Sequence, residues 1–112
     1  MRILEFNVAK QRITKKQDCD FSGLVAGSVG YLYAKFHFSE NEWNRCTDKI
    51  ARFWIGEREY AKLLGADNTC VIPPEVLTGK RFEVSVIGAA NGYKIETNKI
   101  NVRQEVNRYG NS

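Results

Sequence analysis

The sequence predicts an all-β fold, an antiparallel β-sandwich of seven or eight short strands with at most single-turn helices. The clearest signal is in residues 31–38, which alternate strictly between one face formed by Leu32, Ala34, Phe36 and Phe38 and another formed by Tyr31, Tyr33, Lys35 and His37. A period of two indicates a strand with one buried and one more exposed face. Turn residues recur about every 8–12 positions, and no segment has the pattern of a long helix. A small barrel is the alternative architecture.

Three strands are expected in the first part of the chain. Residues 2–8 form the first, with mixed character on both faces. Residues 9–20 are polar and basic, which is typical of a connection or an arm. Residues 21–28 contain two glycines among small and branched side chains, which favours a short strand with a bulge or a close backbone approach. A turn at Val29-Gly30 then leads into the strand 31–38.

The second part is expected to continue in short strands. A capping box from Ser39 to Glu42 allows at most one helical turn before Trp43. Pro74 and Gly79 suit the start and end of another single helical turn. The expected strands are 49–55 and 59–64, joined as a hairpin through a glycine turn, then 70–72, 81–87, 93–97 and 99–106.

Size and composition indicate one domain over residues 1–106, followed by a loose polar tail at 107–112. A chain of 112 residues can bury a core without a metal or a disulfide. The net charge of +4 is dispersed, and only 12–16 and Lys80-Arg81 are locally basic, so it is interpreted as a solvated surface. No apolar run approaches the ~20 residues of a membrane span, so no membrane partner is expected.

Residue patterns argue against catalysis and against a cofactor. The cysteines Cys19, Cys46 and Cys70 are odd in number and widely spaced, which disfavours disulfides or a zinc site. Cys70 is expected to be a small buried side chain, while Cys19 and Cys46 lie in polar segments where one could be a reactive thiol.

Four templates for chemistry also fail. The segment 27–30 lacks the spacing of a nucleophile elbow, and 77–80 lacks the glycine of a phosphate loop. The single histidine, His37, has no evident partner for nucleophilic or metal chemistry. Glu57 and Glu59 flank a predicted turn, where charges normally serve solubility. We therefore expect a protein that is not an enzyme.

Binding is the remaining class of function. The candidate protein-contact residues are Tyr31, Tyr33, Lys35, His37 and Trp54, with Trp43 nearby in sequence, because aromatic side chains with polar tips often anchor interfaces. The alternative is that these aromatics pack in the core or at a sheet edge. Stacking on single-stranded nucleic acid is disfavoured, because specific RNA-binding signatures are missing. The strand 2–8 is predicted either to pair with a neighbouring subunit's sheet or to form an intramolecular edge.

The order of features between Phe21 and Val102 resembles small proteins encoded by tailed phages and prophages of Gram-positive bacteria. The matching segments are 31–38, the Glu-Trp at Trp43, the Ala-Arg-Phe-Trp of 51–54, 70–77, 82–88 and 93–98. They look like the immunoglobulin-like sandwich at the N-termini of phage upper-baseplate proteins, a structural module repeated around an axis. A baseplate protein would continue beyond this sandwich, so a decoration or accessory subunit is included in the expectation.

The resemblance implies a non-enzymatic virion component, such as a tail, baseplate or head-decoration subunit. Its partners would be other phage structural proteins or further copies of itself, and the resemblance brings no catalytic residues. The alternative is an intracellular phage-encoded inhibitor of a host defence system, similar to anti-CRISPR proteins, that binds one host protein or ribonucleoprotein. The expected location is the virion, or the bacterial host cytoplasm during infection.

Overall fold

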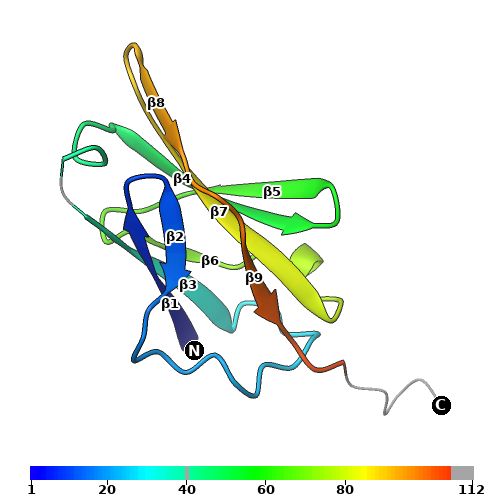
Figure 1. Ribbon diagram of the computed structural model, residues 1–112. Coiled ribbons are helices and arrows are strands. Elements are labelled where there is room, and N and C mark those ends of the chain that lie inside the picture. The colour runs from blue at the N-terminus through cyan, green and yellow to red at the C-terminus, as the bar shows by residue number, and fades with distance from the viewer. Residues whose placement is uncertain (40, 107–112) are drawn as a thin grey trace.

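The computed structural model describes residues 1–39 and 41–106, whose strands form two sheets packed face to face (Figure 1). The first sheet has the order β2-β1-β3-β6, with β1 Arg2–Ala9, β2 Arg12–Lys15, β3 Leu32–Phe38 and β6 Thr69–Val71. The second has the order β5-β4-β7-β8, and β9 also pairs with β7; its strands are β4 Asp48–Ile55, β5 Arg58–Leu63, β7 Arg81–Ala90, β8 Tyr93–Glu96 and β9 Ile100–Arg103. The predicted tail at 107–112 lies outside the described residues.

The expectation of a purely antiparallel sandwich is wrong for one strand pair. β1 and β3 run parallel, in a register from Arg2 opposite Leu32 to Val8 opposite Phe38. The cause is the hairpin between them: β2 returns antiparallel to β1, and residues 16–31 carry the chain back to the end where β1 starts. β1 is therefore enclosed between β2 and β3, which corrects both predictions for it, an edge strand and a strand that pairs with another subunit.

The segment 9–30 differs most from the prediction. Residues 9–20, expected to be a connection, contain β2, which follows a tight turn at Lys10 with a φ of 53°. Residues 21–28, expected to be a strand, form turns and contribute only a single bridge from Val25 to Glu105. Gly23 and Gly27 adopt φ values of 68° and 107°, which side chains rarely tolerate, so the glycines here serve turns rather than a bulge.

The later elements follow the prediction closely. The hairpin of β4 and β5 is present, and a single 3₁₀ turn, η1, covers Pro74–Val76. β7 continues three residues further than predicted. β9 ends at Arg103, and the backbone N–H groups of the next two residues donate hydrogen bonds to carbonyls that lie in loops rather than in a strand. The predicted capping box includes Glu40, which lies outside the described residues, and 41–45 are turns.

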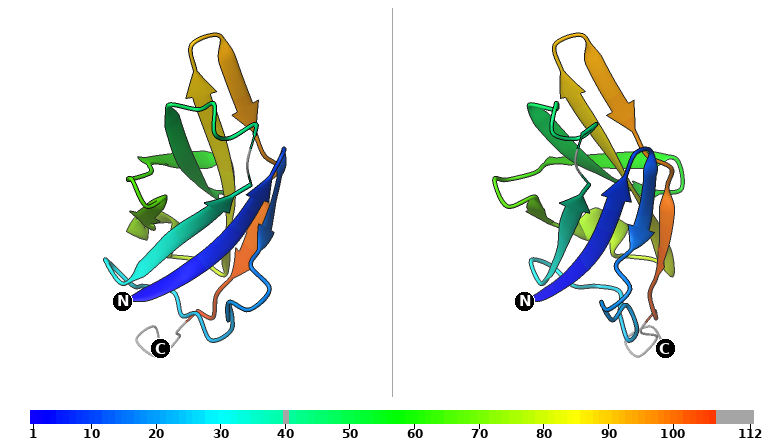
Figure 2. Two further views of the ribbon diagram at one scale, coloured as in Figure 1. Left: turned by 90° about the vertical axis from the view of Figure 1, so that its left-hand side faces the viewer. Right: turned by 60° about the vertical axis from the view of Figure 1, so that its left-hand side comes forward.

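The two sheets face each other (Figure 2), and the buried side chains of the core lie between them. The alternation predicted from the sequence is confirmed, because Leu32, Ala34 and Phe36 are buried while Tyr33 and Lys35 are partly exposed. Phe6 of β1 stacks on Phe36 of β3 with ring centroids 5.3 Å apart. The other core side chains that the strands contribute include Leu4, Val8, Ile13, Ala51, Phe53, Phe82, Val84, Val86 and Val102.

Trp43 completes this core from a loop rather than from a strand. It is fully buried, and its Nε1–H donates a hydrogen bond of 2.8 Å to the carbonyl oxygen of Lys10. Its ring packs beside Phe38 at 4.9 Å between centroids and lies against Gly88. Cys46, expected in a polar loop, is also buried here. Trp43 is therefore a core residue and is not available as a surface contact.

Asn98 links the edges of the two sheets. Its side-chain Oδ1 accepts a 2.9 Å hydrogen bond from the backbone N–H of Ile13 in β2. Its own backbone N–H donates a 3.2 Å bond to the carbonyl of Gln11. Asn98 stands in the loop between β8 and β9, so this loop bonds to the backbone of Ile13 in β2 and of Gln11 in the turn before it.

Candidate protein-contact site

The structure places four of the five predicted contact residues on one surface. Tyr31, Tyr33, Lys35 and His37 lie on the outer side of the first sheet, away from the core. Trp54 belongs to β4 in the second sheet, where it alternates with the buried Phe53 and so points outward on the opposite side of the sandwich. The sequence pattern predicts the exposed side of each strand correctly, but it does not bring Trp54 to the other four.

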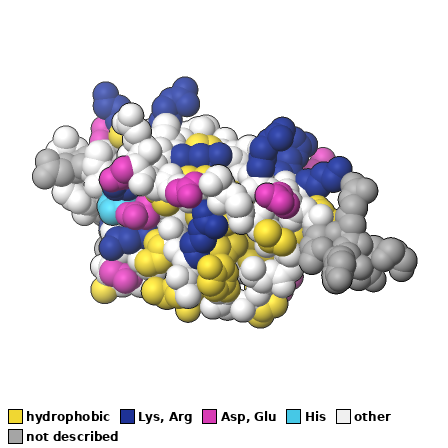
Figure 3. Space-filling model, turned by 90° about the horizontal axis from the view of Figure 1, so that it is seen from below, with side chains coloured by type: hydrophobic (Ala, Val, Ile, Leu, Met, Phe, Trp, Pro, Cys, Tyr) yellow, Lys and Arg dark blue, Asp and Glu magenta, His cyan; other side chains and the backbone are white. Residues whose placement is uncertain are grey.

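Two further strands complete this surface. Ile3 of β1 lies beside Tyr33, and Val71 of β6 lies on the other side of Tyr33, so that an apolar row crosses three strands. Ile3 is 36% exposed, and Tyr31, two residues before Tyr33 along the chain, is 48% exposed. We call the surface formed by Ile3, Glu5, Tyr31, Tyr33, Lys35, His37 and Val71 the tyrosine face. Figure 3 shows hydrophobic side chains gathered in the lower part of that view, with acidic and basic ones beside them.

Charged groups of both signs border the apolar row. His37 Nε2 and Glu5 Oε1 are 2.6 Å apart, across the parallel pair of strands. Glu5 also lies opposite Lys35 in the register of β1 and β3. His37 therefore has a carboxylate partner that the sequence does not reveal, because Glu5 lies on a strand distant in sequence. Opposite charges next to exposed apolar side chains are suited to specific contact with another protein.

Trp54 has mainly structural contacts. Its Nε1–H donates a 3.0 Å hydrogen bond to Oγ of Ser85, a buried side chain of β7. Lys99 Nζ lies 3.7 Å from its ring centroid, and the Arg52 guanidinium lies 5.4 Å away. Because cationic side chains of the same chain contact its ring, the main role of Trp54 is to stabilise the second sheet.

Arg52 and Glu96 form an ion pair beside Trp54, with Nη2 and Oε1 2.6 Å apart. The hydrogen bond from Arg52 is the largest cause that lowers the pKa of Glu96 below its ordinary value of 4.5, and Lys94 adds to it. The Glu96 side chain is 41% exposed, so solvent screens much of this attraction.

Replacing Glu96 with glutamine is expected to lower the free energy of unfolding at neutral pH by at most about 1 kcal/mol. A carboxylate whose pKa is lowered by folding stabilises the protein above its unfolded pKa, here near 4.5. The difference between wild type and Glu96→Gln should therefore be present at pH 7 and vanish as the pH falls below that value. Urea unfolding across this range measures it, with Glu57→Gln in the exposed β4–β5 turn as control. A difference that persists in acid would contradict the assignment.

The cysteines do not converge on a reactive site. Burial raises the pKa of the Cys70 thiol to about 12 and also raises that of Cys46, which disfavours the reactive thiolate form. Cys19 Sγ lies 3.3 Å from the backbone N of Glu5 and 3.7 Å from the carbonyl oxygen of Ile3. These contacts hold the loop after β2 against β1. Of the two cysteines expected in polar segments, only Cys19 is partly exposed.

Other signs of chemistry are weak in the part of the chain that the structure describes. A shallow hollow of about 520 Å³ lies at the β1–β2 turn and is lined by Asn7, Ala9, Lys10, Gln11, Arg12, Thr14 and Asn98, side chains without a carboxylate, imidazole or thiol. Within residues 1–39 and 41–106, no three His, Cys, Asp or Glu side chains are grouped to hold a metal ion. None of the described helices has the length and apolar character to cross a membrane.

Comparison with known proteins adds no family to this description. No protein-family model matches the chain, and no curated protein matches it either. The tyrosine face, its geometry and its charges are therefore the basis for a functional assignment.

Proposed function

We propose that this chain is a non-enzymatic virion component of a phage, a tail, baseplate or head-decoration subunit that acts through protein–protein contacts. The observation that supports the contact role most directly is the apolar row of Ile3, Tyr33 and Val71 on the tyrosine face, with the half-exposed Tyr31 two residues before Tyr33. Exposed apolar and aromatic side chains with a charged border are characteristic of binding surfaces. The phage origin is supported by the sequence resemblance described above.

The finer assignment of the fold is part of this proposal. We infer an immunoglobulin-like module of the kind found in phage upper-baseplate proteins, and the two packed sheets are compatible with it. In such a role the rigid sandwich presents the tyrosine face without a conformational change, because the face rests on three paired strands. Contact residues on a rigid sheet lose little entropy on binding.

A mass-spectrometric inventory of purified virions, from a phage or prophage that encodes this chain, tests the assignment. We expect the protein in many copies per particle. Its absence from virions, together with abundance in infected cells, would overturn the virion role and favour the inhibitor of a host defence system. A pull-down from host lysate would then show whether it captures one host protein or a ribonucleoprotein.

Replacing Tyr33 with alanine is expected to weaken binding to the virion neighbour, identified by cross-linking of intact particles, by about tenfold or more. Tyr33 occupies the centre of the apolar row but is only partly buried. Its loss should therefore change the free energy of unfolding by only about 1 kcal/mol. Titration calorimetry measures the binding, and urea unfolding measures the stability.

The matched control is Tyr93→Ala, which removes the same side chain from β8 in the other sheet. This variant should bind the neighbour as wild type does. If Tyr33→Ala instead binds normally, or lowers stability as much as a core substitution does, the tyrosine face is not the contact surface.

A further inference from the structure

The sheet edges differ in how they are protected. On β2 the backbone N–H of Ile13 is occupied by Asn98, and β6 is only three residues long. β8 and β9, which both pair with β7 at the other edge of the second sheet, have four residues each. β5 is different: it spans six residues, pairs on one side with β4 alone, and stands at the end of its sheet. An unprotected edge presents unpaired backbone N–H and C=O groups, which can receive another strand.

The register shows which groups of β5 are free. In antiparallel pairs, residues bonded to the neighbouring strand alternate with residues whose backbone groups point away from it. The bond from Leu64 N–H to the Lys49 carbonyl places Tyr60 and Lys62 among the residues bonded to β4. Glu59, Ala61 and Leu63 therefore direct their N–H and C=O groups outward, and their side chains are all exposed, Leu63 by 66%. Within the described residues, none of these groups has a hydrogen-bond partner.

We propose that β5 pairs antiparallel with β5 of a second copy of this chain, around a two-fold axis at Ala61. Glu59 would then exchange hydrogen bonds with Leu63 of the second copy, Ala61 with its own counterpart, and Leu63 with Glu59. The residue on the axis is the small alanine, whereas two large side chains at this position would clash. The two second sheets become one continuous sheet across the dimer.

The charges of β5 select this register. With Ala61 on the axis, Lys62 lies opposite Tyr60 of the second copy, and no two like charges face each other. A slip of two residues in one direction places Lys62 opposite its own counterpart. A slip in the other direction places Lys62 opposite Arg58. Like charges directly opposite each other destabilise a strand pair, so both slipped registers are disfavoured.

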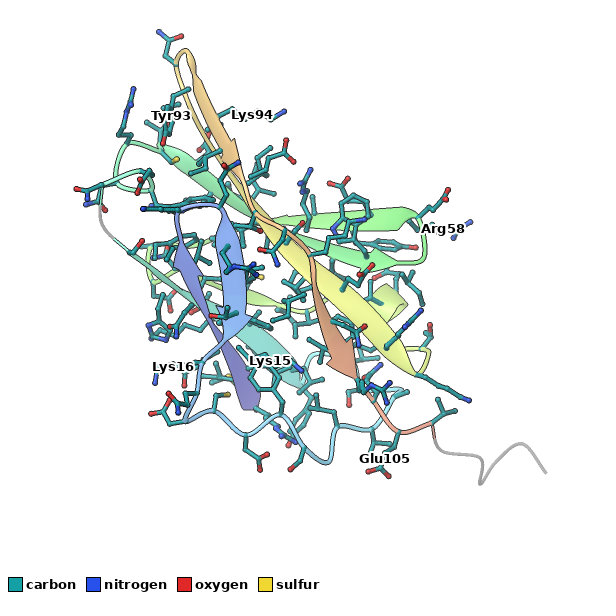
Figure 4. All side chains as sticks on the ribbon, in the orientation of Figure 1. Lys15, Lys16, Arg58, Tyr93, Lys94 and Glu105 are labelled. Atoms are coloured by element: carbon teal, nitrogen blue, oxygen red, sulfur yellow. The ribbon has the colours of Figure 1, made fainter. Side chains whose placement is uncertain are left out.

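The dimer is independent of the virion assignment and of the tyrosine face. β5 lies in the second sheet, and the tyrosine face lies on the first. Figure 4 shows Arg58, the first residue of β5, on the far side of the molecule from Lys16, which follows β2. The two contacts therefore use different sheets, and the strand of the tyrosine face nearest to β5 is β6.

Introducing a charge of either sign at Ala61 tests the proposal with the full chain. Ala61→Lys and Ala61→Glu each place two like charges on the axis, and the Ala61 side chain is exposed, so both variants should fold. Sedimentation velocity over a concentration series is expected to show a dimer for wild type and a monomer for each variant. An equal mixture of the two variants should recover the dimer, as a heterodimer that native mass spectrometry identifies by mass.

Two further variants separate this dimer from other contacts. Ala61→Pro removes an N–H that points away from β4, so it should keep the fold and lose the dimer. Thr14→Lys places the same charge as Ala61→Lys on an exposed position of β2 and should remain dimeric. A wild type that is monomeric at every soluble concentration overturns the proposal. A dimer that survives in Ala61→Lys but is lost in Tyr33→Ala overturns it too, and assigns the dimer to the tyrosine face.

Discussion

Replacing Trp43 with alanine is expected to lower the free energy of unfolding by about 3–5 kcal/mol. The indole is fully buried and packs against Phe38, Cys46 and Gly88. The substitution opens a cavity and also removes the hydrogen bond that the Lys10 carbonyl accepts. Because small domains are stable by only about 5–15 kcal/mol, the variant should be close to the limit of folding. Urea unfolding followed by circular dichroism measures the loss.

Trp43→Phe is the graded control for this prediction. It retains an apolar ring but loses the N–H donor, so its cost should lie between those of wild type and Trp43→Ala. The result also separates Trp43 from the exposed aromatics considered from the sequence. If Trp43→Ala unfolds at the urea concentration of wild type, the loop from 41 to 47 does not contribute to the core as described.

Gly88→Ala is expected to destabilise the protein by about 1–3 kcal/mol, although alanine normally suits a strand better than glycine. A Cβ on Gly88 would lie 2.5 Å from Sγ of Cys46 and 2.7 Å from Cζ3 of Trp43. Both neighbours are buried in the core and have little room to move. The steric cost therefore exceeds the gain in backbone entropy. Urea unfolding again measures the difference.

Gly79→Ala provides the matched control, because its Cβ would have its nearest neighbour, Cδ1 of Ile55, at 3.9 Å. That substitution should leave stability nearly unchanged. The pair Gly88→Ala and Trp43→Phe adds a sharper test. Phenylalanine removes the benzo atoms of the indole that the new methyl group contacts, so the cost of Gly88→Ala should shrink in the Trp43→Phe background. Strictly additive effects would show that the two residues do not meet.

Alternation of apolar and polar residues predicted the strands that have one buried and one exposed face. In 31–38, 49–55 and 81–87 the inward side chains pack in or against the core and most outward ones are more exposed. Ser85 is the exception in β7, since it points outward but is buried and accepts a hydrogen bond from Trp54. β2 was missed because its turn has Lys10 at positive φ, where glycine or asparagine would have indicated a hairpin. For Trp43 the sequence leaves core packing and surface contact open, because a loop residue has no period from which burial can be predicted.

The candidate site could be predicted only strand by strand. The pattern of 31–38 indicates that Tyr31, Tyr33, Lys35 and His37 share a face, but it carries no information on which strands lie beside them. Ile3, Glu5 and Val71 join that face through the parallel register of β1 and the short pairing of β6. Trp54 was grouped with them because alternation reveals the outer side of a strand and not the sheet to which it belongs.

The enclosed position of β1 has a consequence for the order in which the nascent chain can fold. The hairpin of β1 and β2 is complete once residues 2–15 have emerged from the ribosome. The other edge of β1 then has no partner until residues 32–38 emerge and β3 pairs in parallel beside it. During that interval Leu4, Phe6 and Val8 lack the facing sheet that later covers them. Long-range pairing of this kind slows folding and exposes a strand to association, so the hairpin of β1 and β2 is open to association during this interval.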